Sequence, residues 1–316
     1  MDQVTFAQYS GKTANIIFAP VYIALARGYF KDADIDLTID NPKEQPWVTV
    51  SETRADCSPG FIDYCTDPEF VGKLRAVAVH EQFREGHGLT SLLARTAIIK
   101  DGSLTPDPAS IKGKTIGLLG GRGDDYLAYH GVLTQAGLTI DDVKINATPH
   151  GGDARRVALE KGEVDLVIGR RPNGVAGEVA TGEVVRWKVG DEVNRDLQAR
   201  YIMFSTPFMN ERPEVGVRFL SAYLRGARDY VDAFDKSVGR DETLAVLMEQ
   251  TGETAELLTS MKPLGFVPNG RADEGRIAGD IDALVERGLM PKGTTFEAVF
   301  DRSFSDAAVA AIGEYQ

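Results

Sequence analysis

A glycine-rich turn offers the clearest chemistry in this sequence of 316 residues. The segment Gly120-Gly121-Arg122-Gly123 follows a strand-like run and precedes a helix-like run. Glycines let a ligand approach the backbone, and the guanidinium group of Arg122 presents a fork of donors to a carboxylate, sulfonate or phosphate. The spacing is not that of a dinucleotide site, and the turn has no phosphate-binding lysine. We expect Gly121 and Arg122 to contact an anionic group; the alternative is a tight turn with an exposed arginine.

Two more arginines, Arg170 and Arg171, follow the apolar run Val164–Ile168. Such a run is typical of a buried parallel strand, and ligands of open α/β sheets bind at the carboxyl ends of the strands. We assign Arg170 to the site and expect the other arginine to be solvated. The net charge of −12 opposes binding of nucleic acid or of an anionic membrane. It does not prevent a local cationic site, because distant charges are screened beyond about 8–10 Å.

Two loops near the N-terminus also follow strand-like runs. From these loops we expect Tyr9, Ser10, Ser58 and Phe61 to contact the ligand. The rings of Tyr9 and Phe61 could stack on an aromatic group, although aromatic side chains are more often core residues, and both interpretations stay open.

Cys57 could instead be a catalytic nucleophile. His80, Arg84 and His87 lie in one segment that could approach Cys57, lower the pKa of its thiol and produce a thiolate. We favour the alternative, in which Cys57 is a small buried hydrophobic residue, His80 ends a strand and His87 caps a loop. The chain then has no catalytic residue.

The sequence gives no sign of a metal site. His130 and His150 have no partner at the three- or four-residue spacing that a metal site on a helix needs. The chain has two cysteines, Cys57 and Cys65, which are too few for a disulfide scaffold; whether they form one disulfide stays open. We expect neither a metal nor a cofactor.

Strand and helix patterns alternate in the first two thirds of the chain, which predicts an α/β fold. Strand, helix and strand patterns span residues 4–8, 16–26 and 35–39, and the same order returns at 114–119, 125–135 and 143–147. From Pro213 onward apolar residues recur at three- and four-residue steps, as in amphipathic helices. The middle of the chain predicts a compact parallel sheet flanked by helices.

Five pieces, in a fixed order, resemble the type II periplasmic solute-binding proteins, in particular the group that binds nitrate, taurine, aliphatic sulfonates and the pyrimidine precursor of thiamine. The pieces are residues 24–33 (ALARGYFKDA), 111–117 (IKGKTIG), 133–138 (LTQAGL), 158–165 (ALEKGEVD) and 286–290 (ERGLM). The resemblance implies two α/β lobes with a ligand cleft between them. Residues 1–95 and 196–316 would form lobe one, and residues 96–195 would form lobe two.

Three departures from this family stand out. The loop at residues 57–67 (CSPGFIDYCTD) replaces the family's helix entrance of small residues, so the identity of the ligand does not follow from the resemblance. Asp34 replaces a glycine of the first turn, which predicts a turn that depends less on glycine. The cysteine-rich signature of the yeast pyrimidine-precursor synthases, which belong to the same group, is missing, and this argues against that activity.

The resemblance implies a solute-binding protein that passes a small anionic or aromatic molecule, such as a sulfonate, a carboxylate or a heterocycle, to the permease of an ABC-type importer. The alternative is a cytoplasmic enzyme on the same fold, similar to aryl sulfinate desulfinases or small-acid decarboxylases and dehydratases. The desulfinase nucleophile would lie in the first loop, where this chain has Ser10-Gly11-Lys12. The first residues have no signal-peptide pattern, so we expect either a periplasmic or lipid-anchored protein whose signal has been removed, or a cytoplasmic one.

Overall fold

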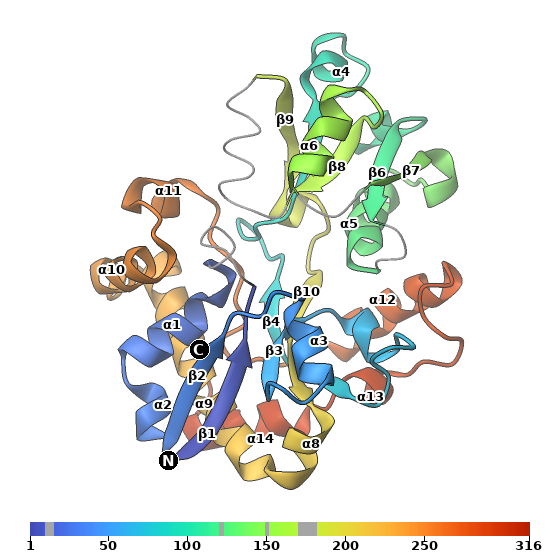
Figure 1. Cartoon of the computed structure of the whole chain (residues 1–316). Helices are drawn as coiled ribbons and strands as arrows, with labels where there is room; N and C mark the ends of the chain where they lie inside the picture. Colours follow the sequence, from blue (N-terminus) through green and yellow to red (C-terminus); the bar gives the residue numbers. More distant parts are fainter. Residues whose placement is uncertain (10–15, 120–122, 149–151, 170–181) are drawn as a thin grey trace. The chain divides into compact units, whose positions relative to one another are not determined.

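The computed structural model describes residues 1–9, 16–119, 123–148, 152–169 and 182–316 (Figure 1). The chain divides into two compact units. Unit 1 comprises Met1–Gln82, Gln198–Ser260 and Leu264–Gln316, and unit 2 comprises Phe83–Leu197 and Met261–Pro263. The first boundary between the units lies after Gln82, whereas the sequence predicted it after residue 95. The reason is that β5 (Ser91–Arg95) pairs with two strands of the sheet in unit 2.

Unit 1 contains a five-stranded mixed sheet in the order β2-β1-β3-β10-β4. Strands β1, β2 and β3 are parallel, and β10 is antiparallel to both of its neighbours. Residues 200–205 of β10 are buried, as expected for a strand with neighbours on both edges. The five strands are β1 (Asp2–Ala7), β2 (Ile35–Asp40), β3 (Cys57–Gly60), β4 (Leu74–Gln82) and β10 (Gln198–Ser205).

Helix α9 (Pro213–Asp235) begins at the proline that the sequence predicted and packs against α1 (Ala19–Ala26). Gly226 permits this close approach, because a Cβ atom there would lie 2.1 Å from the carbonyl oxygen of Pro20. The other helices described in unit 1 are α2 (Tyr29–Asp32), α3 (Pro46–Ser51), α8 (Thr206–Glu211), α10 (Arg240–Thr251), α11 (Ala255–Ser260), α12 (Glu274–Glu286), α13 (Phe296–Val299) and α14 (Ser303–Ile312).

The turn between α1 and β2 keeps the left-handed conformation at two positions. Gly28 has a φ of 76°, and Asp34 has a φ of 57°. Only the first of these residues is a glycine, so the backbone of Asp34 is in a region that costs most side chains energy. The Asp34 carboxylate lies 3.2 Å from the amino group of Met1. Replacing the family glycine with Asp34 therefore does not remove the left-handed turn.

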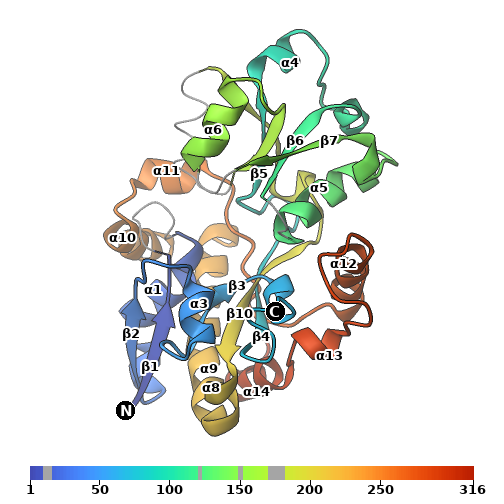
Figure 2. The same cartoon turned by 45° about the vertical axis from the view of Figure 1, so that its right-hand side comes forward.

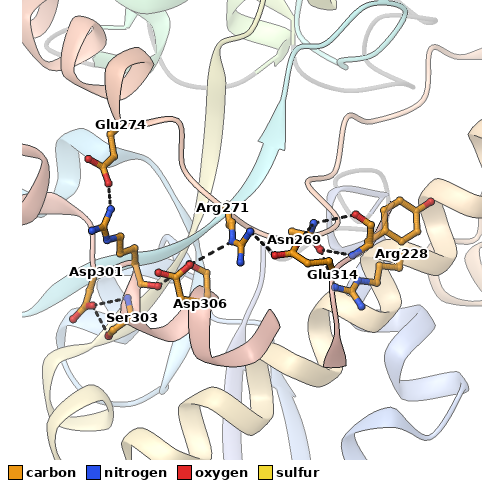
Figure 3. A network of polar contacts seen from close by, with 11 residues as sticks. Arg228, Asn269, Arg271, Glu274, Asp301, Ser303, Asp306 and Glu314 are labelled. Carbon is orange, nitrogen blue, oxygen red and sulfur yellow. Dashed lines mark hydrogen bonds and ion pairs between the residues drawn. The ribbon is translucent and has the colours of Figure 1, made fainter. Parts of the chain in front are cut away.

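Polar contacts join the last residues of the chain to other parts of unit 1 (Figure 3). The carboxylate of Glu314 lies 2.6 Å from a guanidinium nitrogen of Arg271 and accepts a hydrogen bond of 3.0 Å from Asn269. Arg228 of α9 donates a hydrogen bond of 2.8 Å to the side-chain oxygen of Asn269. The end of the chain is thereby tied to α9 through the segment that precedes α12.

Unit 2 contains a second five-stranded sheet, in the order β7-β6-β8-β5-β9. Three of its strands, β5, β6 and β7, are labelled in Figure 2. Strands β6, β7 and β8 are parallel, but β5 is antiparallel to β8 and to β9, so the sheet is mixed rather than parallel as predicted. The crossover from unit 1 enters through β5, and this explains its direction. The remaining strands are β6 (Thr115–Leu119), β7 (Lys144–Thr148), β8 (Leu166–Gly169) and β9 (Val184–Val189).

Helices cover both faces of this sheet. Tyr129 and Val132 of α5 (Gly123–Gln135) pack on the face that carries Leu92, and Leu159 of α6 (Gly152–Glu160) packs on the face that carries Leu93. A short helix, α4 (Thr96–Lys100), follows β5. Among the described residues, no helix has the length and apolar character needed to cross a membrane.

Candidate ligand-binding site at the carboxyl edge of the sheet in unit 1

Three strands of unit 1 end, and a fourth begins, at one edge of the sheet. Because β10 is antiparallel to both β3 and β4, strands β1, β3 and β4 run in the same direction and end at the same edge, where β10 begins. Tyr9 follows β1, Phe61 follows β3, Glu81 lies at the end of β4, and Arg200 lies near the start of β10. We call this edge, where ligands bind in open α/β sheets, the carboxyl edge.

Four aromatic rings, which we call the aromatic cluster, lie at the carboxyl edge: Tyr9, Trp47 of α3, Phe61 and Tyr64. The centroid of the Trp47 ring lies 6.0 Å from that of Tyr9, 6.4 Å from that of Phe61 and 4.4 Å from that of Tyr64. Tyr9 is partly exposed, whereas the other three rings are buried. The cluster therefore combines a packed aromatic base with one ring that can meet a solute.

A buried ion pair lies beside the aromatic cluster. Arg200 and Glu81 face each other across neighbouring strands, and their side chains are 5% and 0% exposed. The guanidinium group donates a hydrogen bond to the carboxylate, and its carbon lies 5.7 Å from the centroid of the Phe61 ring. A buried charge needs a partner of this kind, because burial alone strongly destabilises an ion.

Two neutral side chains, His80 and Tyr223, lie near this ion pair. Nδ1 of His80 lies 2.6 Å from the hydroxyl oxygen of Tyr223. Burial, with a contribution from the positive charge of Arg200, lowers the pKa of His80 to about 3, so the ring is neutral at physiological pH. Burial and the charge of Glu81 raise the pKa of Tyr223, so its hydroxyl is neutral as well.

Neutral polar groups line the edge at β1 and β2. The Tyr22 hydroxyl donates a hydrogen bond of 2.7 Å to the side-chain oxygen of Gln8, whose amide nitrogen donates one of 2.9 Å to Asn41. On the neighbouring strand, Ser58 Oγ is buried and has no hydrogen-bond partner among the described residues. The described part of the edge thus offers aromatic rings and neutral hydrogen-bonding groups.

Three of the predicted ligand-binding residues lie in unit 1: Tyr9 and Phe61 in the aromatic cluster, and Ser58 in β3. Ser10, Gly121, Arg122 and Arg170 lie outside the described residues, and so do Arg171 and His150.

Sequence reasoning missed Trp47, Glu81 and Arg200. One signal was available for Arg200, because a charged residue stands directly before the apolar run Tyr-Ile-Met-Phe. Glu81 and Trp47 carry no comparable signal.

Cys57 does not join the histidines in a thiolate constellation. Its side chain is fully buried, with Sγ 3.8 Å from the carbonyl oxygen of Thr5, and burial together with the Asp56 carboxylate raises the pKa of its thiol. Cys57 is the first residue of β3, where it pairs with Phe204 of β10, whereas His80 is near the end of β4. Cys57 and His80 therefore lie toward opposite ends of the parallel strands β3 and β4. Arg84 and His87 belong to unit 2.

Cys57 and Cys65 are both free thiols. Burial raises the pKa of Cys65 to about 12. These surroundings oppose formation of a thiolate at either cysteine.

A second buried ion pair lies in unit 2. Oδ2 of Asp125, in the first turn of α5, lies 3.0 Å from a guanidinium nitrogen of Arg155 in α6, and their side chains are 0% and 10% exposed. Arg155 also donates a hydrogen bond to the carbonyl oxygen of Ile168 in β8. The Asp125 carboxylate thus joins α5 to α6.

Within the ranges that the structure describes, no group of three or more His, Cys, Asp or Glu side chains could hold a metal ion.

The chain matches the family described as "NMT1/THI5 like" over residues 15–57 and 89–235. It is 25% identical to the riboflavin-binding protein RibY of Chloroflexus aurantiacus over 245 residues, which cover 75% of this chain and 66% of the relative. The match thus spans just under two thirds of that relative.

Solved structures share the fold over nearly the whole chain. The periplasmic aliphatic sulphonate binding protein SsuA of Escherichia coli superimposes with a TM-score of 0.68 at 16% identity, covering 96% of this chain and 92% of that one. The desulfurization enzyme DSZB superimposes with a TM-score of 0.62 at 15% identity, covering 99% of this chain and 100% of that one. These likenesses confirm the predicted α/β fold of the periplasmic binding proteins. Since the family match covers more than half of the residues, the resemblance inferred from the sequence is confirmed, and the chain belongs to the NMT1/THI5-like family.

Proposed function

We propose that this protein is the solute-binding component of an ABC-type importer and that its ligand is a small molecule with an aromatic ring. The proposal agrees with the family and with the name of the riboflavin-binding relative. The observation that carries it is the aromatic cluster at the carboxyl edge, in which Tyr9 is partly exposed above buried rings.

The charge of this edge favours an aromatic over an anionic anchor in unit 1. Its arginine, Arg200, is already neutralised by Glu81. The predicted anion-binding residues, Arg122 and Arg170, remain a separate proposal for an anionic ligand.

The enzyme alternative draws on one comparison, because DSZB is a desulfurization enzyme with a similar fold. Fold alone does not transfer activity. The buried thiol of Cys57, with its raised pKa, offers no nucleophile, and we therefore rank solute binding first.

Tryptophan fluorescence tests the proposal. The chain has two tryptophans, so Trp187→Phe leaves Trp47, in the aromatic cluster, as the single reporter. Riboflavin is the first probe, because it absorbs tryptophan emission and carries a flat ring system. We expect saturable quenching, weakened about tenfold by Tyr9→Ala through the loss of roughly 1–2 kcal/mol of stacking, and preserved by Tyr9→Phe, which keeps the ring.

Isothermal calorimetry supplies an independent readout, with naphthalene-2-sulfonate and ethanesulfonate as aromatic and aliphatic anions. Saturable binding of an aromatic probe supports the proposal. Binding of ethanesulfonate alone would contradict the aromatic ligand, and the absence of binding by all three probes would contradict the proposed function.

A further inference from the structure

We infer that the Glu81–Arg200 pair is a ligand-selecting subsite, which recognises an uncharged group with a hydrogen-bond acceptor next to a donor, such as a cyclic amide or imide. This inference rests on the proposed function and specifies the polar part of the ligand.

The position of the pair is the first argument. Glu81 and Arg200 are direct partners across β4 and β10, at the carboxyl edge. The guanidinium group is in contact range of Phe61, which also belongs to the aromatic cluster. A flat ligand that stacks in the cluster would thus direct one edge toward this pair.

The second argument is unused hydrogen-bonding capacity. The pair is joined through one guanidinium nitrogen, Nη1, and one carboxylate oxygen, Oε2. The other carboxylate oxygen, Glu81 Oε1, and the guanidinium nitrogen Arg200 Nε are buried and have no hydrogen-bond partner among the described residues. Buried polar atoms in native proteins are usually satisfied, so an acceptor and a donor that both lack a partner within one ion pair need an explanation. A ligand N–H facing Oε1 and a ligand C=O facing Nε would satisfy both.

The third argument is charge. A lone buried arginine would select an anion, but here the carboxylate cancels its charge and would repel a sulfonate or carboxylate. Three residues near the pair, His80, Tyr223 and Phe61, add no charge, because all are neutral at physiological pH. The pair therefore favours a neutral group that both donates and accepts.

Access requires a local movement. The side chains of Glu81 and Arg200 are 0% and 5% exposed, so a ligand can reach the two vacant atoms only when the side chains above them shift. Such a shift would alter the surroundings of the neighbouring Trp47, which makes its fluorescence a suitable reporter.

The first experiment needs no variant in the pair. Affinities of the Trp187→Phe protein are measured for riboflavin, whose imide edge carries an N–H between two carbonyl groups, and for 3-methylriboflavin, in which a methyl group replaces that hydrogen. We expect the methylated probe to bind at least about tenfold more weakly, because it cannot donate to Oε1. Equal affinities would overturn the inference while leaving the proposed function intact.

The second experiment changes the selectivity. Glu81→Gln removes the negative charge but keeps the shape of the side chain, so Arg200 becomes an uncompensated cation. We expect about tenfold tighter binding of naphthalene-2-sulfonate and weaker binding of riboflavin. Arg200→Lys keeps the charge but loses Nε, and it should weaken riboflavin binding.

Asp280→Asn is the matched control, since Asp280 is a buried carboxylate that pairs at 3.1 Å with Arg276 of its own helix, α12, and not with Arg200. It should leave both affinities unchanged, and circular dichroism verifies the fold of every variant. If Glu81→Gln does not fold, the comparison of riboflavin with its methylated form decides the inference alone. Tighter binding of the sulfonate than of riboflavin by the wild-type protein contradicts the inference, and binding of neither contradicts the proposed function and the inference with it.

Discussion

Nδ1 of His80 lies 2.6 Å from the hydroxyl oxygen of Tyr223, and this contact joins the end of β4 to the middle of α9. Burial lowers the pKa of His80 from 6.5 to about 3, so the folded protein does not take up the proton that an unfolded histidine binds below pH 6.5.

The first prediction follows from this shift. Between pH 6.5 and 3 the unfolded state binds one more proton at this site, so stability should fall by about 1.4 kcal/mol for each unit of falling pH. His80→Gln cannot take up this proton. Urea unfolding at pH 7, 6 and 5 should therefore show a smaller loss of stability for the variant than for the wild type. Parallel losses in the two proteins would mean that His80 titrates normally in the fold.

The close packing of α1 against α9 gives the second prediction. Gly226→Ala would place a Cβ atom 2.1 Å from the carbonyl oxygen of Pro20, and overpacking of this kind should cost about 1–3 kcal/mol. Gly279→Ala is the matched control, because a Cβ atom at this exposed position of α12 meets nothing within 4 Å. It should stabilise the protein by about 0.5–1 kcal/mol through helix propensity. Thermal unfolding measures both; a neutral Gly226→Ala would contradict the close contact.

The third prediction concerns the buried pair of unit 2. Asp125→Ala should destabilise the protein by about 3–5 kcal/mol, because it leaves the positive charge of Arg155 buried without its partner. The double variant with Arg155→Ala should lose less than the sum of the single losses. For comparison, Glu160→Ala removes a helical ion pair near the surface, with Arg156, and should cost no more than about 0.5 kcal/mol. Additive losses for Asp125 and Arg155 would show that the two are not coupled.

The fourth prediction separates binding from thiol chemistry. Because Cys57 and Cys65 are both buried and their pKa values are raised, iodoacetamide should label neither at pH 7 until the protein is unfolded in urea. Cys57→Ala should retain riboflavin affinity. Mass spectrometry of the labelled protein provides the measurement, and rapid labelling of folded Cys57 that a ligand prevents would favour the enzyme alternative.

Local rules predicted the elements of this fold well. The runs at residues 4–8, 35–39 and 114–119 became β1, β2 and β6, since alternation and apolar runs are local properties. The directions of β5 and β10 were not predicted, because they depend on where the chain crosses between the units rather than on residue patterns. The antiparallel strand β10 enters unit 1 between β3 and β4.

The residues of the candidate site likewise divide into those that local patterns predict and those that depend on contacts between distant segments. Tyr9 and Phe61 could be assigned because the ends of parallel strands meet at one edge. The Glu81–Arg200 pair joins residues 119 positions apart, and no local pattern specifies such a contact. The pairing also changes the ligand that Arg200 can be expected to bind, because an arginine neutralised by a carboxylate no longer favours an anion.

The position of β10 between β3 and β4 affects the order in which the two units can fold during synthesis. Strands β3 and β4 cannot be joined until residues 198–205 have left the ribosome, whereas the sheet of unit 2 is built entirely from residues 91–189. During synthesis the inserted unit can therefore assemble first, while the N-terminal strands wait with an open edge that is prone to aggregation. The order of folding would thus be the reverse of the order in which the two units begin along the chain.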